Sequence, residues 1–159
     1  MYHYWRKFWR VLSSTVLKDR ISKVPGASIK MLEKVFSRFD SDQEMQLINF
    51  ALAPLYSETY NADQGLSSCL KTKYRAKSHN DLYSEEEKYF DYTSQLKLFK
   101  KPTLIIVGEK DWICPPSQSK KIHDLVDNSK LVVVPNANHS AHLEYPDFVL
   151  DKVIVFLRT

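Results

Sequence analysis

The stretch IIVGEKDWICPP, Ile105–Pro116, decides the fold of this chain. An apolar run from Leu104 to Val107 ends at Gly108, as expected for a short strand whose two faces are both covered. Asp111 follows this glycine closely, and Pro116 suits the first turn of a helix predicted over 116–126. The stretch therefore predicts a buried strand that delivers an acid to the rim of a site.

A second strand is predicted at Lys130–Pro135, where the run KLVVVP is rich in β-branched residues. A polar loop follows it, and Asp147 is expected to cap a final helix. The apolar stripe expected on that helix consists of Phe148, Val149, Val153, Phe156 and Leu157. Strand, helix, strand and helix in this order, with buried strands, indicate a parallel α/β arrangement.

The first hundred residues are predicted to be mainly helical. Helices are expected over 4–18, 28–39 and 41–56, and the pattern from Ser41 to Glu44 is typical of a capping box. The segment that follows, up to about residue 98, has no regular periodicity. The predicted organisation is therefore a helical region at 1–98 and an α/β region at 99–159.

Composition excludes several classes of function. The chain has 159 residues, 43% of them hydrophobic, and a net charge of +4 that is spread from end to end, so nucleic-acid binding is not expected. Its 3 glycines cannot form a phosphate-binding loop or a dinucleotide fingerprint. Cys69 and Cys114 have neither metal-ligand nor CxxC spacing, which favours reduced thiols in the cytoplasm.

Membrane attachment is the less favoured interpretation of the amino-terminal sequence. The start, MYHYWRKFWRVL, lacks the apolar core and cleavage site of a signal peptide, and no run reaches the length of a transmembrane helix. The aromatic residues of the first twenty positions, beside basic ones, are compatible with an interfacial helix. We expect them to pack against the protein itself, without a membrane partner.

Two side chains stand where an active site is expected. Ligands of parallel sheets bind beyond the carboxyl ends of the strands, where Asp111 follows the first strand and His139 follows the second. An imidazole at this edge can act as a general base, and a carboxylate can orient it. Taken singly, Asp111 could be a turn acid and His139 a surface residue, and His142 is a competing imidazole.

The segment from Lys101 to Leu157 resembles the closing portion of an α/β-hydrolase, with its acid loop, last strand, histidine loop and terminal helix. The spacing from Gly108 to Asp111 resembles the family's acid motif, and Asn138-His139 resembles its Gly-His. This resemblance implies that Asp111 and His139 are the acid and the base of a catalytic triad. Asn138 departs from the family's glycine, although asparagine can also take the left-handed conformation that glycine would favour.

The preceding helices resemble the lid of the proline iminopeptidase branch of these hydrolases, which implies a small peptide or ester substrate and neither a metal nor an organic cofactor. The resemblance implies acidic lid residues that bind the amino terminus of a substrate. The candidates, none of which is singled out, are Glu33, Glu44, Glu58 and Glu85–Glu87. Ser117 and Trp112 could shape the rim of the pocket, although structural roles are favoured for both.

The nucleophile of this family is absent from the sequence. The family carries it on a G-x-S-x-G turn, whereas GLSSC at Gly65–Cys69 has a cysteine at the closing position and no strand before it. Two strands alone would also leave an unpaired sheet edge. We therefore expect a partial α/β-hydrolase fold whose nucleophile half precedes Met1, or whose open edge is covered by a complementing chain or a second copy.

Two other functions stay open at this stage. One is hydrolysis of an ester, an epoxide or another small molecule by the same fold, because fold does not determine substrate. An Asp in place of the missing serine would indicate epoxide or haloalkane chemistry. The other is a non-catalytic binding module that retains the residues of a hydrolase. On the leading interpretation the chain has no turnover alone, because a triad needs its nucleophile.

Overall fold

The structure is a computed structural model that describes residues 15–22, 24–83 and 91–158. The chain divides into two compact units. The first unit is Met1–Leu55 with Tyr60–Phe90, and the second unit is Tyr56–Thr59 with Asp91–Thr159. The four residues from Tyr56 to Thr59 thus belong with the carboxyl-terminal part of the chain.

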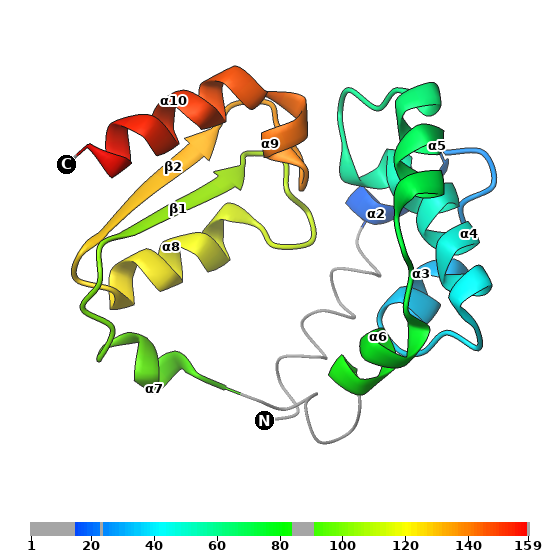
Figure 1. Cartoon of the computed structure of the whole chain (residues 1–159), viewed down its shortest axis with the longest axis horizontal. Coiled ribbons are helices and arrows are strands. Elements are labelled where there is room, and N and C mark those ends of the chain that lie inside the picture. The colour runs from blue at the N-terminus through cyan, green and yellow to red at the C-terminus, as the bar shows by residue number, and fades with distance from the viewer. Residues whose placement is uncertain (1–14, 23, 84–90, 159) are drawn as a thin grey trace. The chain divides into compact units, whose positions relative to one another are not determined.

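The described part of the first unit is helical (Figure 1). Its elements are α2 (Thr15–Ser22), α3 (Ile29–Val35), α4 (Asp42–Leu52), the start of the 3₁₀ helix η1 (Ala53–Tyr56), α5 (Ala62–Lys71) and α6 (Ala76–Leu82). The core side chains are almost completely buried: Leu17, Leu32, Phe39, Leu52 and Leu55. The predicted helix over 4–18 lies mostly outside the described residues. Within the described ranges, no helix is long and apolar enough to cross a membrane.

The helix starts of the first unit follow the predicted caps only in part. The Ser41 hydroxyl accepts a hydrogen bond from the Glu44 N–H at 3.0 Å, as a capping box requires. The Glu44 carboxylate, however, accepts from the N–H of Asp40 at 2.6 Å and pairs with Lys34 at 2.8 Å. The reciprocal half of the box is therefore replaced by a contact with the preceding turn.

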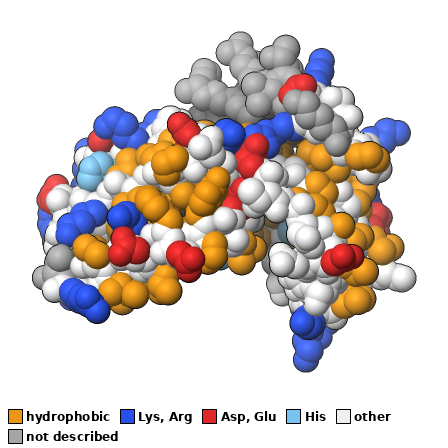
Figure 2. Space-filling view, turned by 90° about the horizontal axis from the view of Figure 1, so that it is seen from above, with side chains coloured by type: hydrophobic (Ala, Val, Ile, Leu, Met, Phe, Trp, Pro, Cys, Tyr) orange, Lys and Arg blue, Asp and Glu red, His pale blue; other side chains and the backbone are white. Residues whose placement is uncertain are grey.

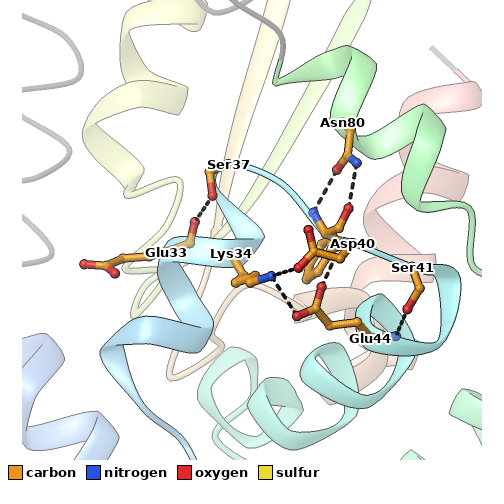
Figure 3. Close-up of polar contacts among 8 residues, drawn as sticks. Glu33, Lys34, Ser37, Asp40, Ser41, Glu44 and Asn80 are labelled. Carbon is orange, nitrogen blue, oxygen red and sulfur yellow. Dashed lines mark hydrogen bonds and ion pairs between the residues drawn. The ribbon is translucent and has the colours of Figure 1, made fainter.

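Helix α6 is held by residues that are far away in sequence. Its cap residue, Arg75, makes no side-chain cap, and the carboxylate of Asp42 accepts from the N–H of Ala76 at 2.8 Å instead. Asn80 accepts from the backbone N–H of Phe39 at 2.9 Å and donates to the carbonyl of the same residue at 2.8 Å (Figure 3). These contacts attach α6 to the turn between α3 and α4.

The second unit contains two parallel strands, as predicted. Strand β1 (Thr103–Gly108) pairs with β2 (Ser129–Val134) from Thr103 opposite Ser129 to Gly108 opposite Val134. Its helices are α7 (Thr93–Leu96), α8 (Pro116–Leu125), α9 (Ala141–Glu144) and α10 (Pro146–Leu157). Helices α8 and α10 contact both strands and lie on opposite sides of them (Figure 1). The predicted partial α/β fold is thereby confirmed.

The start of α10 differs from the prediction. Tyr145 is the cap residue, no side chain caps the helix, and Asp147 lies within the first turn, so the prediction that Asp147 caps the helix is wrong. The physical reason is Pro146, which suits the first helical position because its missing N–H has no partner there. The helix therefore begins one residue before the predicted cap.

Only part of the predicted apolar stripe of α10 is covered. Val149 packs against the buried cluster of Val134, Ala137 and Ala141. Phe148 and Leu157 are exposed, as are Leu150, Ile154 and Val155 on the same helix. Hydrophobic side chains are visible on the surface of the chain in Figure 2. Two strands cover too narrow an area to bury the whole apolar face of this helix.

We expect Asn80→Ala to lower the free energy of unfolding by roughly 1–3 kcal/mol, because the N–H and C=O of Phe39 would both lose their partner. Asn80→Asp retains the acceptor and should have an intermediate effect. Urea unfolding followed by circular dichroism measures both. Ser94→Ala is the control, since the Ser94 hydroxyl is exposed and donates to the neighbouring Gln95 side chain. An Asn80→Ala protein as stable as that control would contradict this role.

Candidate functional site

Two loops meet at the carboxyl ends of the strands. We name residues 109–115 the acid loop and residues 135–140 the histidine loop. The N–H of Glu109 donates to the carbonyl of Val134 at 3.0 Å, which extends the ladder past the end of β1. The N–H of Lys110 then donates to the carbonyl of Ala137 at 2.8 Å. These backbone bonds set the distance between the loops before any side chain is considered.

Gly108 is the residue that permits this close approach. A Cβ atom at this position would lie 2.5 Å from the carbonyl oxygen of Ala137 and 2.7 Å from its carbonyl carbon, and it would also collide with the carbonyl oxygen of Asn138. These are backbone atoms, so a rotamer change cannot relieve the clash. The glycine that ends the predicted strand is therefore a packing requirement of the histidine loop.

Asp111 and His139 are in direct contact, as the sequence predicts. The distance between Oδ2 of Asp111 and Nδ1 of His139 is 2.9 Å. Asp111 is 6% exposed, and its other oxygen, Oδ1, accepts from the N–H groups of Ile113 at 2.9 Å and Cys114 at 2.8 Å. One carboxylate oxygen thus shapes the acid loop and the other holds the imidazole.

The His139 ring combines a fixed orientation with an accessible nitrogen. An ionised carboxylate only accepts hydrogen bonds, so Nδ1 carries the donated proton and Nε2 is the basic nitrogen. The side chain is 41% exposed, and its Nε2 has no hydrogen-bond partner among the described residues. The hydrogen bond to Asp111 raises the pKa of His139 above its ordinary value of 6.5, and this increase outweighs the opposing effect of burial. Such an imidazole can accept a proton from an approaching hydroxyl.

Asn138 does not take the left-handed backbone conformation that is open to asparagine. Among the described residues other than glycine, only Asn136 has a positive φ, at 59°. Asn138 is instead completely buried and uses its side-chain amide. Its Oδ1 accepts from the N–H of His139 at 2.8 Å, and its Nδ2 donates to Glu58 at 3.0 Å. Hydrogen bonding, and not left-handed geometry, explains an asparagine before the histidine.

The other predicted side chains have different surroundings. His142 is exposed on α9, and Asp111 bonds to His139 instead. Trp112 is buried with its ring centroid 6.0 Å from that of Tyr56, which favours a structural role, while Ser117 is exposed in the first turn of α8.

The candidate acids of the helical region have different surroundings. Glu33 is exposed, Glu44 pairs with Lys34, and Glu58 bonds to Asn138. Glu85–Glu87 lie outside the described residues. Of the described side chains, no group of three or more His, Cys, Asp or Glu is arranged to hold a metal ion.

The GLSSC stretch is part of a helix. Gly65–Cys69 lies inside α5, which begins at Ala62 with a side-chain cap from Asn61. A nucleophile of this family needs a sharp turn between a strand and a helix, and neither of the two described strands leads into α5. This segment therefore does not provide the nucleophile elbow.

Sequence reasoning missed the contribution of Tyr56–Thr59. The carbonyl of Tyr56 accepts from the N–H of Ser140 at 3.2 Å, and the Tyr56 ring lies 6.0 Å from the His139 ring between centroids. The N–H of Glu58 donates to the Glu144 carboxylate at 2.7 Å. These partners lie about eighty residues away from Tyr56–Thr59 in the sequence, so no local sequence pattern predicts the contacts.

Comparisons with known proteins agree with the α/β fold of this chain. The family model described as alpha/beta hydrolase fold matches residues 28–146. Proline iminopeptidase PfmaB of Pestalotiopsis fici is 52% identical over 138 residues, which are 86% of this chain and 49% of that protein. The chain thus spans about half the length of this relative.

Two further matches are more distant. The pimeloyl-[acyl-carrier protein] methyl ester esterase of Nitrosospira multiformis is 31% identical over 68 residues, 43% of this chain and 26% of that protein. An alpha/beta fold family hydrolase of Bacillus anthracis superposes with a TM-score of 0.62 at 21% identity, covering 80% of this chain and 46% of that one. The structural match supports the fold alone.

We expect Asp111→Asn to lower the pKa of His139 towards 6.5, because the charged partner that favours the imidazolium is lost. A raised pKa stabilises the folded state below the unfolded value, and this contribution disappears as pH rises through the folded value. The destabilisation should therefore be larger at about pH 5.5 than at about pH 8.5. Histidine NMR titration and urea unfolding at both pH values measure these effects. Asp127→Asn is the control, and equal titration of His139 in all three proteins would contradict the assignment.

We expect Gly108→Ala to destabilise the chain by several kcal/mol, on the order of the largest effects of single substitutions, because a methyl group would strike backbone atoms of the histidine loop. Gly26→Ala is a useful comparison, since Gly26 has a φ of 90° but open space around it. It should cost only about 1 kcal/mol of backbone strain. Urea midpoints rank the two, and an equal or smaller effect at position 108 would show that the loops can move apart.

Proposed function

Because the chain belongs to the α/β-hydrolase fold family, we propose that it supplies the acid and the histidine of a serine-hydrolase triad in an enzyme related to proline iminopeptidase. The observation that carries the proposal is the 2.9 Å contact between Asp111 and His139 at the carboxyl ends of two parallel strands. Ligands of parallel sheets bind at this edge. The nucleophile would come from the part of the fold that is not present in these 159 residues.

In this proposal the two groups divide the work of proton transfer. His139 would take the proton of the serine hydroxyl through Nε2 and later donate it to the leaving group. Asp111 would keep Nδ1 protonated and stabilise the imidazolium that forms. The N–H groups of Ile113 and Cys114 on the other carboxylate oxygen hold Asp111 in position for this role. No step requires a metal ion or an organic cofactor.

The proposed substrate is a short peptide whose amino-terminal residue is removed. The support is the 52% identity with a protein named proline iminopeptidase. The ester-hydrolase alternative has weaker support, from the 31% identity with a methyl ester esterase over 43% of the chain. Both alternatives use the same two residues, so substrate assays and not the geometry of the pair separate them.

The second unit also presents surfaces that a further section of the fold could cover. In the described part of the chain the sheet has two strands, so β1 and β2 each have one edge without a strand partner. Five hydrophobic side chains of α10 are exposed: Phe148, Leu150, Ile154, Val155 and Leu157. We propose that a section carrying the nucleophile pairs along the sheet, and that the helical first unit serves as the cap of the complete enzyme.

A chimaera tests this function directly. The aligned 138 residues of Proline iminopeptidase PfmaB are replaced by those of this chain, and release of p-nitroaniline from a proline anilide is measured. We expect turnover, and we expect His139→Ala or Asp111→Ala to reduce kcat by about 10⁴-fold. His142→Ala, on the exposed face of α9, is the matched control and should retain activity. A p-nitrophenyl ester assayed in parallel tests the alternative.

Two outcomes would contradict the proposal. One is a folded chimaera in which His139→Ala is as active as the parent protein. The other is turnover by the isolated chain with a serine of this chain labelled by a fluorophosphonate, because the nucleophile would then lie within it.

A further inference from the structure

Glu58 lies between the residues that immediately precede the two members of the pair. Its Oε1 accepts from Nδ2 of Asn138 at 3.0 Å, and its Oε2 lies 4.0 Å from the ammonium group of Lys110. Asn138 precedes His139, and Lys110 precedes Asp111. A single carboxylate therefore contacts both the acid loop and the histidine loop.

The two contacts of Glu58 have unequal weight. The pair with Lys110 is long, and the Lys110 side chain is 43% exposed, so this pair contributes little. Asn138 is completely buried, and a buried amide N–H without an acceptor costs about 1–3 kcal/mol. Of the two contacts, the one with Asn138 therefore contributes more to holding the histidine loop.

Glu144 closes a ring of hydrogen bonds around this contact. One of its carboxylate oxygens accepts from the backbone N–H of Asn138 at 2.9 Å, and the other accepts from the backbone N–H of Glu58 at 2.7 Å. Glu58, Asn138 and Glu144 are therefore joined pairwise. A ring of this kind fixes the side-chain amide of Asn138, whose Oδ1 accepts from the N–H of His139.

We propose that Glu58 is a positioning residue for His139, which acts through the buried amide of Asn138 to hold the imidazole against Asp111. The role rests on the proposed function only in that the positioned imidazole is the catalytic base. Its consequences for the geometry of the pair are measurable in the isolated chain, without any turnover.

The first test compares Glu58→Ala with Glu58→Gln in the full chain, by NMR titration of His139 and by the exchange rate of its Nδ1 proton. Both variants lose the negative charge, but the introduced glutamine can still accept from Asn138. We expect the Nδ1 proton to exchange at least about tenfold faster in Glu58→Ala, with the pKa of His139 shifted towards 6.5, and near-parent behaviour in Glu58→Gln. Asp127→Ala, which removes a surface carboxylate paired with Lys100, is the control.

The second test reverses the polarity of the contact. Asn138→Asp loses the donor and faces Glu58 with a like charge, whereas in Glu58→Gln/Asn138→Asp the introduced glutamine amide can donate to the introduced aspartate. Both proteins carry the same aspartate before His139, so its direct charge effect on the imidazole cancels in the comparison. We expect slow Nδ1 exchange to return in the double variant. Circular dichroism establishes that each variant is folded.

Two results would overturn the role of Glu58. Equal changes in Glu58→Ala and Glu58→Gln would show an effect of charge without positioning. Unchanged exchange in both, or no recovery in the double variant, would show that Asp111 alone holds the imidazole. Neither result bears on whether Asp111 and His139 serve catalysis, which the chimaera decides.

Discussion

The hydrogen bond from the backbone N–H of Lys110 to the carbonyl of Ala137 is the contact on which the site depends. It joins the ends of two strands whose parallel register already brings Gly108 opposite Val134. The loops can approach to this distance only because position 108 has no side chain. With the backbones joined, the side chains of Asp111 and His139 meet at the same edge of the sheet, so the pair follows from the arrangement of the two strands.

The polar side chains around this contact each form hydrogen bonds with more than one partner. Asp111 bonds to its own loop through one oxygen and to His139 through the other. Asn138 likewise accepts from His139 and donates to Glu58. Buried polar groups are costly unless they are satisfied, and a network in which each member has two partners lowers that cost while it restricts movement. The histidine loop is consequently held from the acid loop, from α9 and from the segment at Tyr56–Thr59.

The predictable and unpredictable parts of this chain differ in the range of their interactions. The strands, α8 and the meeting of Asp111 with His139 follow from local apolar runs, a glycine, a proline and the rule for parallel sheets. Helices α5 and α6 were not predicted, and α6 depends on Asp42, which lies in a distant segment. The hydrogen bond of the Asn138 amide was not predicted, because its partner, Glu58, is about eighty residues away. Local sequence patterns do not predict contacts between segments that are so far apart in the chain.

The exposure of His139 connects the partial fold to its proposed chemistry. Its hydrogen bond to Asp111 raises the pKa of the ring, while burial acts in the opposite direction. In the isolated chain the side chain is 41% exposed, so the first effect is larger. A section of the fold that covered this edge would increase the desolvation and lower the pKa of the imidazole. Completing the sheet would thus favour the unprotonated form of His139. This is the form whose Nε2 accepts the proton of a nucleophile.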